Sequence, residues 1–275
     1  MRIDKTIMKC VVFVGHKTER GFAVEGTGFF LMCFEGGLGF QQIVTARHVI
    51  TSFKSEYVYI RLNNQDGTPR VLATKKSDWI FHPNPAIDVG ILPIEISAEG
   101  CDVLHIHMEQ YLLTKEVIEK SGVGEGDEVF IAGAYVSRVG ESKNLPIVRV
   151  GNIASMAVEP VWPASKDRPA YLIEVRSLGG LSGSPVFVHL PLVTRVRGEA
   201  KALKGRHEYF LGMVLGHHVN RHDLDTILDD HDLEEDQQKT DFNTGIAVVL
   251  PADQIVEVVQ LPWLVEERKK WRRST

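Results

Sequence analysis

Cysteine is scarce in this sequence, and the few cysteines form no pattern. The 275 residues include three of them, Cys10, Cys33 and Cys101, which are far apart in the chain. An odd number without a close pair argues against a disulfide framework and against a cysteine-rich zinc site. We therefore expect three thiols in the core of a protein from a reducing compartment.

Long apolar runs are also absent. A helix that spans a bilayer needs roughly 18–20 apolar residues, and the nearest uncharged run, residues 26–34, is far shorter. At the N-terminus, Lys9 interrupts the only apolar stretch, and the small-residue cleavage site of a secretory signal is missing. The expectation is a cytoplasmic protein without a membrane partner.

The sequence has no excess of positive charge, since 31 basic and 36 acidic side chains give a net charge of −5. This balance excludes a general binder of polyanions. The most basic segment is the C-terminal tail, where residues 268–273 surround Trp271. A short basic terminus more often increases solubility than binds nucleic acid, so no nucleic-acid partner is expected.

Short segments of β-strand type fill most of the chain instead, and 44% hydrophobic residues are enough for a large core in one or two domains. The segments are rich in Val, Ile, Phe and Thr and are separated by Gly, Pro, Asn and Asp, which is typical of antiparallel sheets. A first group comprises residues 6–14, 22–34, 40–50, 57–62, 70–74 and 88–96. A second group comprises residues 128–135, 146–156, 170–176, 184–190, 209–218 and 245–250.

The simplest architecture for these twelve segments is all-β, with two six-stranded antiparallel β-barrels. A short amphipathic helix is expected over residues 109–120, and a C-terminal helix begins at residue 251 until Pro262 breaks or kinks it. The predicted organisation is a first barrel over 1–108, a linker over 109–126, a second barrel over 127–250, and a helix with a basic tail over 251–275.

Three motifs place a side chain of a catalytic type beside an apolar strand. They are Thr-Ala-Arg-His-Val around His48, Ala-Ile-Asp-Val-Gly around Asp88, and Gly-Gly-Leu-Ser-Gly-Ser-Pro around Ser182. In this order, and with Gly-Thr-Gly at residues 26–28, they resemble the histidine, aspartate and serine motifs of trypsin-like proteases with the chymotrypsin fold. The closer likeness is to bacterial Htr-type proteases, here without a PDZ domain.

The resemblance implies a serine endopeptidase that cuts protein or peptide substrates through an acyl-enzyme, without a metal or an organic cofactor. Ser182 would attack the carbonyl carbon, His48 would accept and return the proton, and Asp88 would orient the imidazole. The backbone N–H groups of Gly180 and Ser182 would form the oxyanion hole.

A substrate pocket is implied less directly. Counting six residues back from the serine gives Arg176 as the base of the pocket, and Leu215, Gly216 and His217 would form its wall. A cation at the base would favour an acidic substrate residue before the cut bond.

Departures from the digestive trypsins leave other readings open. Val49 and Leu181 stand where those enzymes have a cysteine and the acid that pairs with a new N-terminus, so activation by cleavage is not implied. A silent binding module with a collapsed oxyanion loop, or a protease activated by a partner, therefore remains as an alternative. An α/β-hydrolase is disfavoured because Gly-x-Ser-x-Gly is absent around Ser182 and the chain order of the three residues differs.

A histidine and aspartate cluster follows the presumed pocket. It contains His217, His218, His222, Asp223 and His231, and its spacing fits no known metal signature, so no metal is predicted. The many carboxylates of residues 222–238 favour a solvated insertion, because like charges repel one another. Lying near the presumed cleft, this insertion is expected to gate or select substrates. Residues 195–207, which are basic, are expected to form a hairpin tip.

Overall fold

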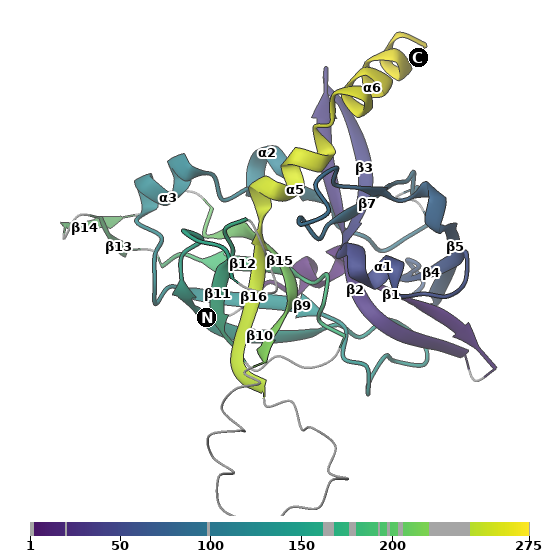
Figure 1. The fold of residues 1–275 in the computed structure, drawn as a ribbon, viewed down its shortest axis with the longest axis horizontal. Coiled ribbons are helices and arrows are strands. Elements are labelled where there is room, and N and C mark those ends of the chain that lie inside the picture. The colour runs from purple at the N-terminus through teal and green to yellow at the C-terminus, as the bar shows by residue number, and fades with distance from the viewer. Residues whose placement is uncertain are drawn as a thin grey trace, which may run out of the picture.

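Two groups of β-strands make up most of the molecule (Figure 1). The computed structural model describes residues 3–19, 21–97, 100–161, 168–175, 180–191, 193–196, 199–202, 206–219 and 243–274. None of the helices in these ranges combines the length and the apolar character that a membrane span requires.

The first group is an eight-stranded sheet in the order β5-β4-β1-β2-β3-β7-β6, with β8 joined to β2. All its pairs are antiparallel except β2 with β8. The six predicted segments appear in it, and the two-residue strands β6 and β8 are additional. The strands are β1 Val11–Thr18, β2 Gly21–Glu35, β3 Leu38–Thr45, β4 Tyr57–Asn63, β5 Pro69–Lys75, β6 Ile80–Phe81, β7 Gly90–Pro93 and β8 Ile106–His107.

The second group closes into a six-stranded barrel in the order β10-β11-β16-β15-β12-β9, as the sequence predicts. Its strands are β9 Glu128–Gly133, β10 Ile147–Ser155, β11 Tyr171–Glu174, β12 Pro185–His189, β15 Glu208–Val219 and β16 Asn243–Pro251. A separate antiparallel hairpin, β13 Val193–Val196 with β14 Glu199–Ala202, includes part of the basic segment 195–207. Residues 197–198 and 203–205 of that segment lie outside the described residues, so its predicted tip stays a prediction.

Two predicted strands are shorter than their apolar patterns suggest. The run over 6–14 begins as the 3-10 helix η1, Lys5–Cys10, because the Asp4 side chain accepts a hydrogen bond from the Thr6 N–H at 2.9 Å and caps it. The run over 40–50 ends at Thr45, and helix α1, Arg47–Thr51, follows it. A further 3-10 helix, η2, covers Lys76–Asp78.

The single helix predicted over 109–120 is wrong, since the chain forms α2, Met108–Tyr111, and α3, Lys115–Ser121. Between them the Leu113 N–H bonds the Phe210 carbonyl at 3.0 Å, and the Thr114 hydroxyl accepts from the Val117 N–H at 3.2 Å as an N-cap. A contact with a distant strand therefore interrupts a helical pattern.

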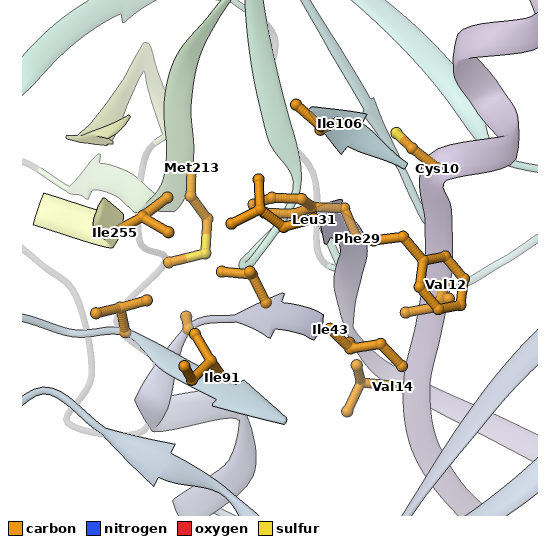
Figure 2. Close-up of a cluster of buried hydrophobic side chains, with 14 of the residues drawn as sticks. Cys10, Val12, Val14, Phe29, Leu31, Ile43, Ile91, Ile106, Met213 and Ile255 are labelled. Atoms are coloured by element: carbon orange, nitrogen blue, oxygen red, sulfur yellow. The ribbon is translucent and has the colours of Figure 1, made fainter. Parts of the chain in front are cut away.

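The chain ends in two helices, α5 Ala252–Val259 and α6 Pro262–Ser274. Pro262 starts the second helix, a position that proline tolerates because the first N–H of a helix has no partner. Figure 2 shows Met213 of β15 and Ile255 of α5 among first-sheet side chains such as Leu31 and Ile91. One continuous core therefore joins the two groups of strands.

Candidate active site

Asp88 and His48 form a hydrogen-bonded pair at neighbouring ends of β7 and β3. The Asp88 carboxylate lies 2.5 Å from His48 Nδ1 through Oδ2, and Oδ1 accepts from the His48 backbone N–H at 2.8 Å. Strands β3 and β7 pair as far as Thr45 and Gly90, which brings α1 and the aspartate loop together. With Nδ1 donating to the carboxylate, Nε2 of His48 is left as a proton acceptor.

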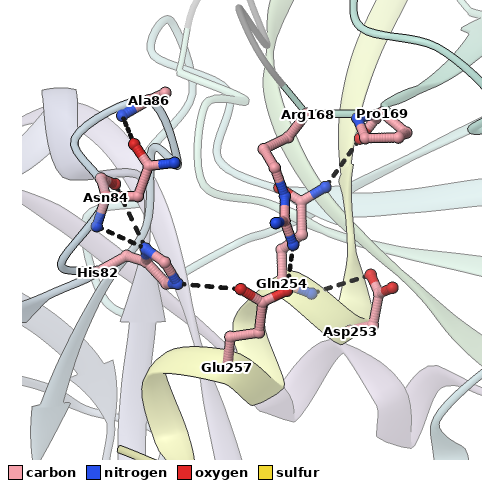
Figure 3. A network of polar contacts seen from close by, with 8 residues as sticks. All are labelled: His82, Asn84, Ala86, Arg168, Pro169, Asp253, Gln254 and Glu257. Atoms are coloured by element: carbon pink, nitrogen blue, oxygen red, sulfur yellow. Dashed lines mark hydrogen bonds and ion pairs between the residues drawn. The ribbon is translucent and has the colours of Figure 1, made fainter.

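The loop that carries Asp88 is fixed by His82, which is 9% exposed. Its backbone N–H donates to the Val89 carbonyl, and its Nδ1 accepts from the Asn84 N–H at 3.0 Å. The other ring nitrogen, Nε2, lies 3.2 Å from the Glu257 carboxylate on α5 (Figure 3). Glu257 in turn contacts Arg168. This network holds the aspartate loop against the C-terminal helix.

Ser182 comes from the loop before β12 and meets the histidine side of the site around Gly26. A Cβ on Gly26 would lie 2.7 Å from Val49 Cγ1 and 3.2 Å from the Ser182 carbonyl oxygen, so only glycine fits between them. The Ser182 hydroxyl donates to the Leu215 carbonyl at 3.2 Å. A β-bulge in the β15–β16 pairing at Leu215 makes that carbonyl available. Within the described residues no hydrogen bond joins Ser182 Oγ to His48.

The loop predicted to form the oxyanion hole, residues 180–183, is called the oxyanion loop below, and Thr27 of the first sheet holds it. The Thr27 hydroxyl donates to the Gly180 carbonyl at 2.7 Å and accepts from the Ala134 N–H at 2.9 Å, while the Thr27 N–H donates to the Ser182 carbonyl at 2.9 Å. No hydrogen bond joins the Gly180 or Ser182 N–H to another described residue. The carbonyls of Gly180 and Ser182 are thus turned toward Thr27.

Leu181 takes the place of the acid that pairs with a new N-terminus in the digestive trypsins. Its side chain is 1% exposed and packs in the core of the second barrel. The Ser184 N–H bonds the Leu181 carbonyl at 2.9 Å and closes the turn around the serine. Burial of the Leu181 side chain therefore anchors this loop in the core of the second barrel.

Gly183 is required by the same turn. Its φ is +84°, a conformation that L side chains rarely adopt, and an added Cβ would lie 2.0 Å from the Thr27 carbonyl oxygen. Gly180 also has a positive φ, +92°. A β-carbon at Gly180 would lie 2.8 Å from Val136 Cγ1.

The predicted pocket is only partly within the described residues. Arg176 lies outside them, so its charge at the pocket base stays a prediction. Leu215 is buried, whereas a Cβ on Gly216 would meet no atom of the described residues within 4 Å. His217 belongs to β15, and its backbone pairs with Ala247.

The acidic insertion over 222–238 lies outside the described residues, as do His222, Asp223 and His231 of the histidine cluster. Elsewhere in the described part of the chain, no three His, Cys, Asp or Glu side chains come close enough to hold a metal ion. All three cysteines are free and buried.

Sequence reasoning missed the role of Thr27, although the Gly-Thr-Gly motif drew attention to its position. It also missed Val136, which lies against Gly180 and lines a cavity of about 920 Å³. That cavity lies between the β1–β2 turn, β4 and the loop that joins β9 to β10. Nothing in the local sequence of that loop signals its place beside the serine.

No protein-family model and no curated protein sequence matches the chain. Among solved structures, the apo form of the MamO protease domain from Magnetospirillum magneticum matches with a TM-score of 0.53 and 16% identity, over 92% of this chain and 96% of that one. A variant of the HtrA-type protease AlgW, solved with a decapeptide, matches with a TM-score of 0.51 and 11% identity, over 92% of this chain and 63% of that one. The chain therefore has the trypsin-like protease fold of the Htr type.

Proposed function

We propose that this protein is a serine endopeptidase that hydrolyses peptide bonds with Ser182 as the nucleophile. The observation that carries the proposal is the His48–Asp88 pair, in which Nδ1 lies 2.5 Å from the carboxylate. That contact selects the tautomer whose Nε2 can accept a proton, which a serine hydroxyl needs to become nucleophilic. The protease domains with the same fold support it, and the decapeptide in the AlgW structure suggests peptide substrates.

The reaction begins with rotation of the Ser182 hydroxyl from the Leu215 carbonyl toward His48 Nε2. Ser182 Oγ attacks the peptide carbonyl carbon, and His48 takes the hydroxyl proton. The carbonyl oxygen gains the negative charge, which the N–H groups of Gly180 and Ser182 stabilise. His48 then passes the proton to the leaving amine, and the C–N bond breaks to leave an ester on Ser182.

Hydrolysis of the ester repeats these steps with water as the nucleophile. His48 takes a proton from the water, and the oxygen attacks the ester carbon. The Ser182 oxygen leaves and recovers the proton from His48, which releases the acid product. Asp88 stays ionised and stabilises the imidazolium at each step.

Labelling with a fluorophosphonate probe tests the proposal, because the probe reacts with an activated serine. The wild-type chain is expected to label rapidly, and Ser182→Ala and His48→Ala are expected to abolish labelling. Ser184→Ala is the matched control from the same turn, since its hydroxyl is buried and has no hydrogen-bond partner in the described part of the chain. Labelling that survives Ser182→Ala would refute the assignment of the nucleophile.

A catalytically silent or partner-activated module is the second candidate. It is favoured by one observation, the bond of the Ser182 hydroxyl to Leu215 in place of His48. If the folded wild-type chain does not label, this candidate replaces the first. Labelling that appears after cell extract is added would then identify partner activation.

Cleavage of a peptide library tests the pocket assigned to Arg176. We expect enrichment of Asp or Glu before the cut bond, because a cation at the pocket base pairs with a carboxylate. Enrichment of Lys or Arg at that position would contradict it.

A further inference from the structure

Arg61 is a buried cation in β4, where it alternates with Ile60 and Leu62, so its side chain lies on the other face of the strand. Its side chain lies in the first sheet, and the residue is 4% exposed. The guanidinium reaches across to the second barrel, where it donates to the backbone of the loop that joins β9 to β10. Nη2 donates to the carbonyls of Gly140 at 2.7 Å and Glu141 at 3.1 Å, and Nη1 donates to Val139 at 3.5 Å.

Asn63, two residues after Arg61 in β4, binds Asn144 of the same loop. The Asn144 backbone N–H donates to Asn63 Oδ1 at 2.7 Å, and the Asn144 carbonyl accepts from Asn63 Nδ2 at 3.3 Å. Asn144 is 4% exposed, and its side-chain amide donates to the Arg61 carbonyl at 2.5 Å. Arg61 and Asn63, which are two residues apart in β4, thus both bind the β9–β10 loop of the second barrel.

The hydrogen bonds of Arg61 run to carbonyl oxygens, and no ion pair joins it to a carboxylate of the described residues. Burial lowers the pKa of its guanidinium because the charged form loses water. A buried cation without a carboxylate is a costly way to fill a strand position that an apolar residue would fill well. What the cation adds is a fork of donors aimed at a single loop.

The other end of that loop touches the oxyanion loop. Val136 Cγ1 lies 2.8 Å from the point where a Cβ of Gly180 would stand. The Ala134 N–H donates to the Thr27 hydroxyl that holds the Gly180 carbonyl. Displacement of the β9–β10 loop would therefore move Gly180 from one side and disturb its Thr27 contact from the other.

We propose that Arg61 is a positioning residue, which holds the β9–β10 loop so that Val136 and Ala134 keep Gly180 in its oxyanion-binding conformation. This inference rests on the proposed function. It supplies the anchor that an N-terminal ion pair supplies in the digestive trypsins, together with the buried Leu181. Arg61 touches no reacting atom and acts through the loop.

The test compares Arg61→Met with Arg61→Lys, and uses Arg70→Met as the matched control on β5. Arg70 is exposed and makes no hydrogen bond to the β9–β10 loop. The measurements are the rate of fluorophosphonate labelling across pH, the fraction labelled at completion, and the melting temperature. Asn144→Ala is a second variant that keeps the cation, in case Arg61→Met does not fold.

We expect Arg61→Met to lower the maximal labelling rate roughly tenfold or more, which corresponds to about 1.4 kcal/mol of barrier. The labelled fraction should stay complete and the apparent pKa of labelling should not move, because the His48–Asp88 pair is untouched. Arg61→Lys should recover part of the rate. An unchanged rate, or a loss confined to the labelled fraction, would overturn the inference.

Hydrogen exchange separates failure of this inference from failure of the proposed function. The amides of Thr27, Gly183 and Ser184 are hydrogen-bonded in and around the oxyanion loop. Arg61→Met should speed their exchange, and Arg70→Met should not, whether or not the wild-type chain labels. Unchanged exchange at these amides in Arg61→Met would overturn the inference even if the chain is a working protease.

Discussion

The two halves of the candidate active site are held in place differently. His48 and Asp88 lie at the paired ends of β3 and β7, and the Arg47 N–H donates to the Asp88 carbonyl at 3.4 Å, so this half is built mainly within one sheet. The serine half is a loop, and both hydrogen bonds from Thr27 to it come from the other group of strands. Its geometry therefore depends on contacts with the first sheet as well as on its bonds to β15 of the second barrel, such as that of the Gly183 N–H to the Val214 carbonyl at 2.8 Å.

This difference separates two kinds of failure. Under the proposed function, loss of His48 removes the proton acceptor, and loss of Asp88 removes the group that orients it. Damage to the second half spoils the orientation of the nucleophile and of the N–H donors, and it follows from changes far from Ser182. Under the proposed function, we expect that loosening the contact between the two groups of strands lowers activity even though His48, Asp88 and Ser182 are kept.

The largest effect is expected from Gly183→Ala. The new Cβ would lie 2.0 Å from the Thr27 carbonyl oxygen and 2.4 Å from Thr45 Oγ1, so the serine half must move. We expect loss of fluorophosphonate labelling and a fall in the free energy of unfolding of roughly 2–4 kcal/mol. Chemical denaturation measures the second quantity.

Gly67→Ala is the control for Gly183→Ala. Gly67 has a φ of +85°, close to the +84° of Gly183, but a Cβ there would meet none of the atoms that the structure describes within 4 Å. It should cost only about 1 kcal/mol, from backbone conformation alone. Equal effects at the two sites would show that backbone strain, and not the clash with Thr27, governs the loop.

Asp88→Asn should damage the first half alone. The asparagine Oδ1 can still accept from the His48 N–H, but its NH₂ would face Nδ1 and select the tautomer with the proton on Nε2. We expect labelling to slow by roughly 10³- to 10⁴-fold with little change in melting temperature. A pH-rate profile measures the labelling rate, and a melting curve measures the stability. A labelling rate close to that of the wild type, together with a large fall in melting temperature, would contradict the role of Asp88 in orienting His48.

Thr27→Val should damage the second half alone. The Gly180 carbonyl loses its donor and the Ala134 N–H loses its acceptor. Because these buried groups are left without a hydrogen-bond partner, the free energy of unfolding should fall by about 1–3 kcal/mol. Labelling should slow about tenfold to a hundredfold, because the N–H donors are misaligned and not removed. The hydrogen bond between His48 Nδ1 and Asp88, followed by NMR, should be the same as in the wild type, and its loss would contradict the division between the halves.

Much of the architecture follows from local pattern. The six-stranded second barrel and the main strands of the first sheet come from alternating apolar residues between turn residues, which is a local property. The histidine, aspartate and serine motifs likewise indicate which strand ends to inspect, and the structure brings Asp88 to His48.

The rest depends on tertiary partners that no local pattern reveals. The break between α2 and α3 requires the Phe210 carbonyl, and the apolar run after residue 40 turns helical only beyond Thr45, where the aspartate loop binds it. In the sequence, Arg61 is a charged residue within an otherwise mainly apolar strand. Its partners become evident only in the structure, where the β9–β10 loop accepts its hydrogen bonds. The serine half could therefore be located from the sequence but not assembled from it.

The smallest effect concerns acid, and it reaches the sheet that carries the first half. His105 lies against Phe30 of β2, with ring centroids 5.2 Å apart, and its pKa is lowered from 6.5 to about 4 by burial and then by the charge of His107. Above pH 6.5 neither state of the chain is protonated at His105 and no stability is lost. As the pH falls from 6.5 toward 4, the unfolded chain binds a proton that the folded chain does not, so stability decreases.

Urea denaturation across this range should show a steeper loss of stability in the wild type than in His105→Gln, and hydrogen exchange should place the early opening in the first sheet. Equal slopes in the two proteins would mean that His105 is protonated alike in both states, and the first half would then be no more sensitive to acid than the second.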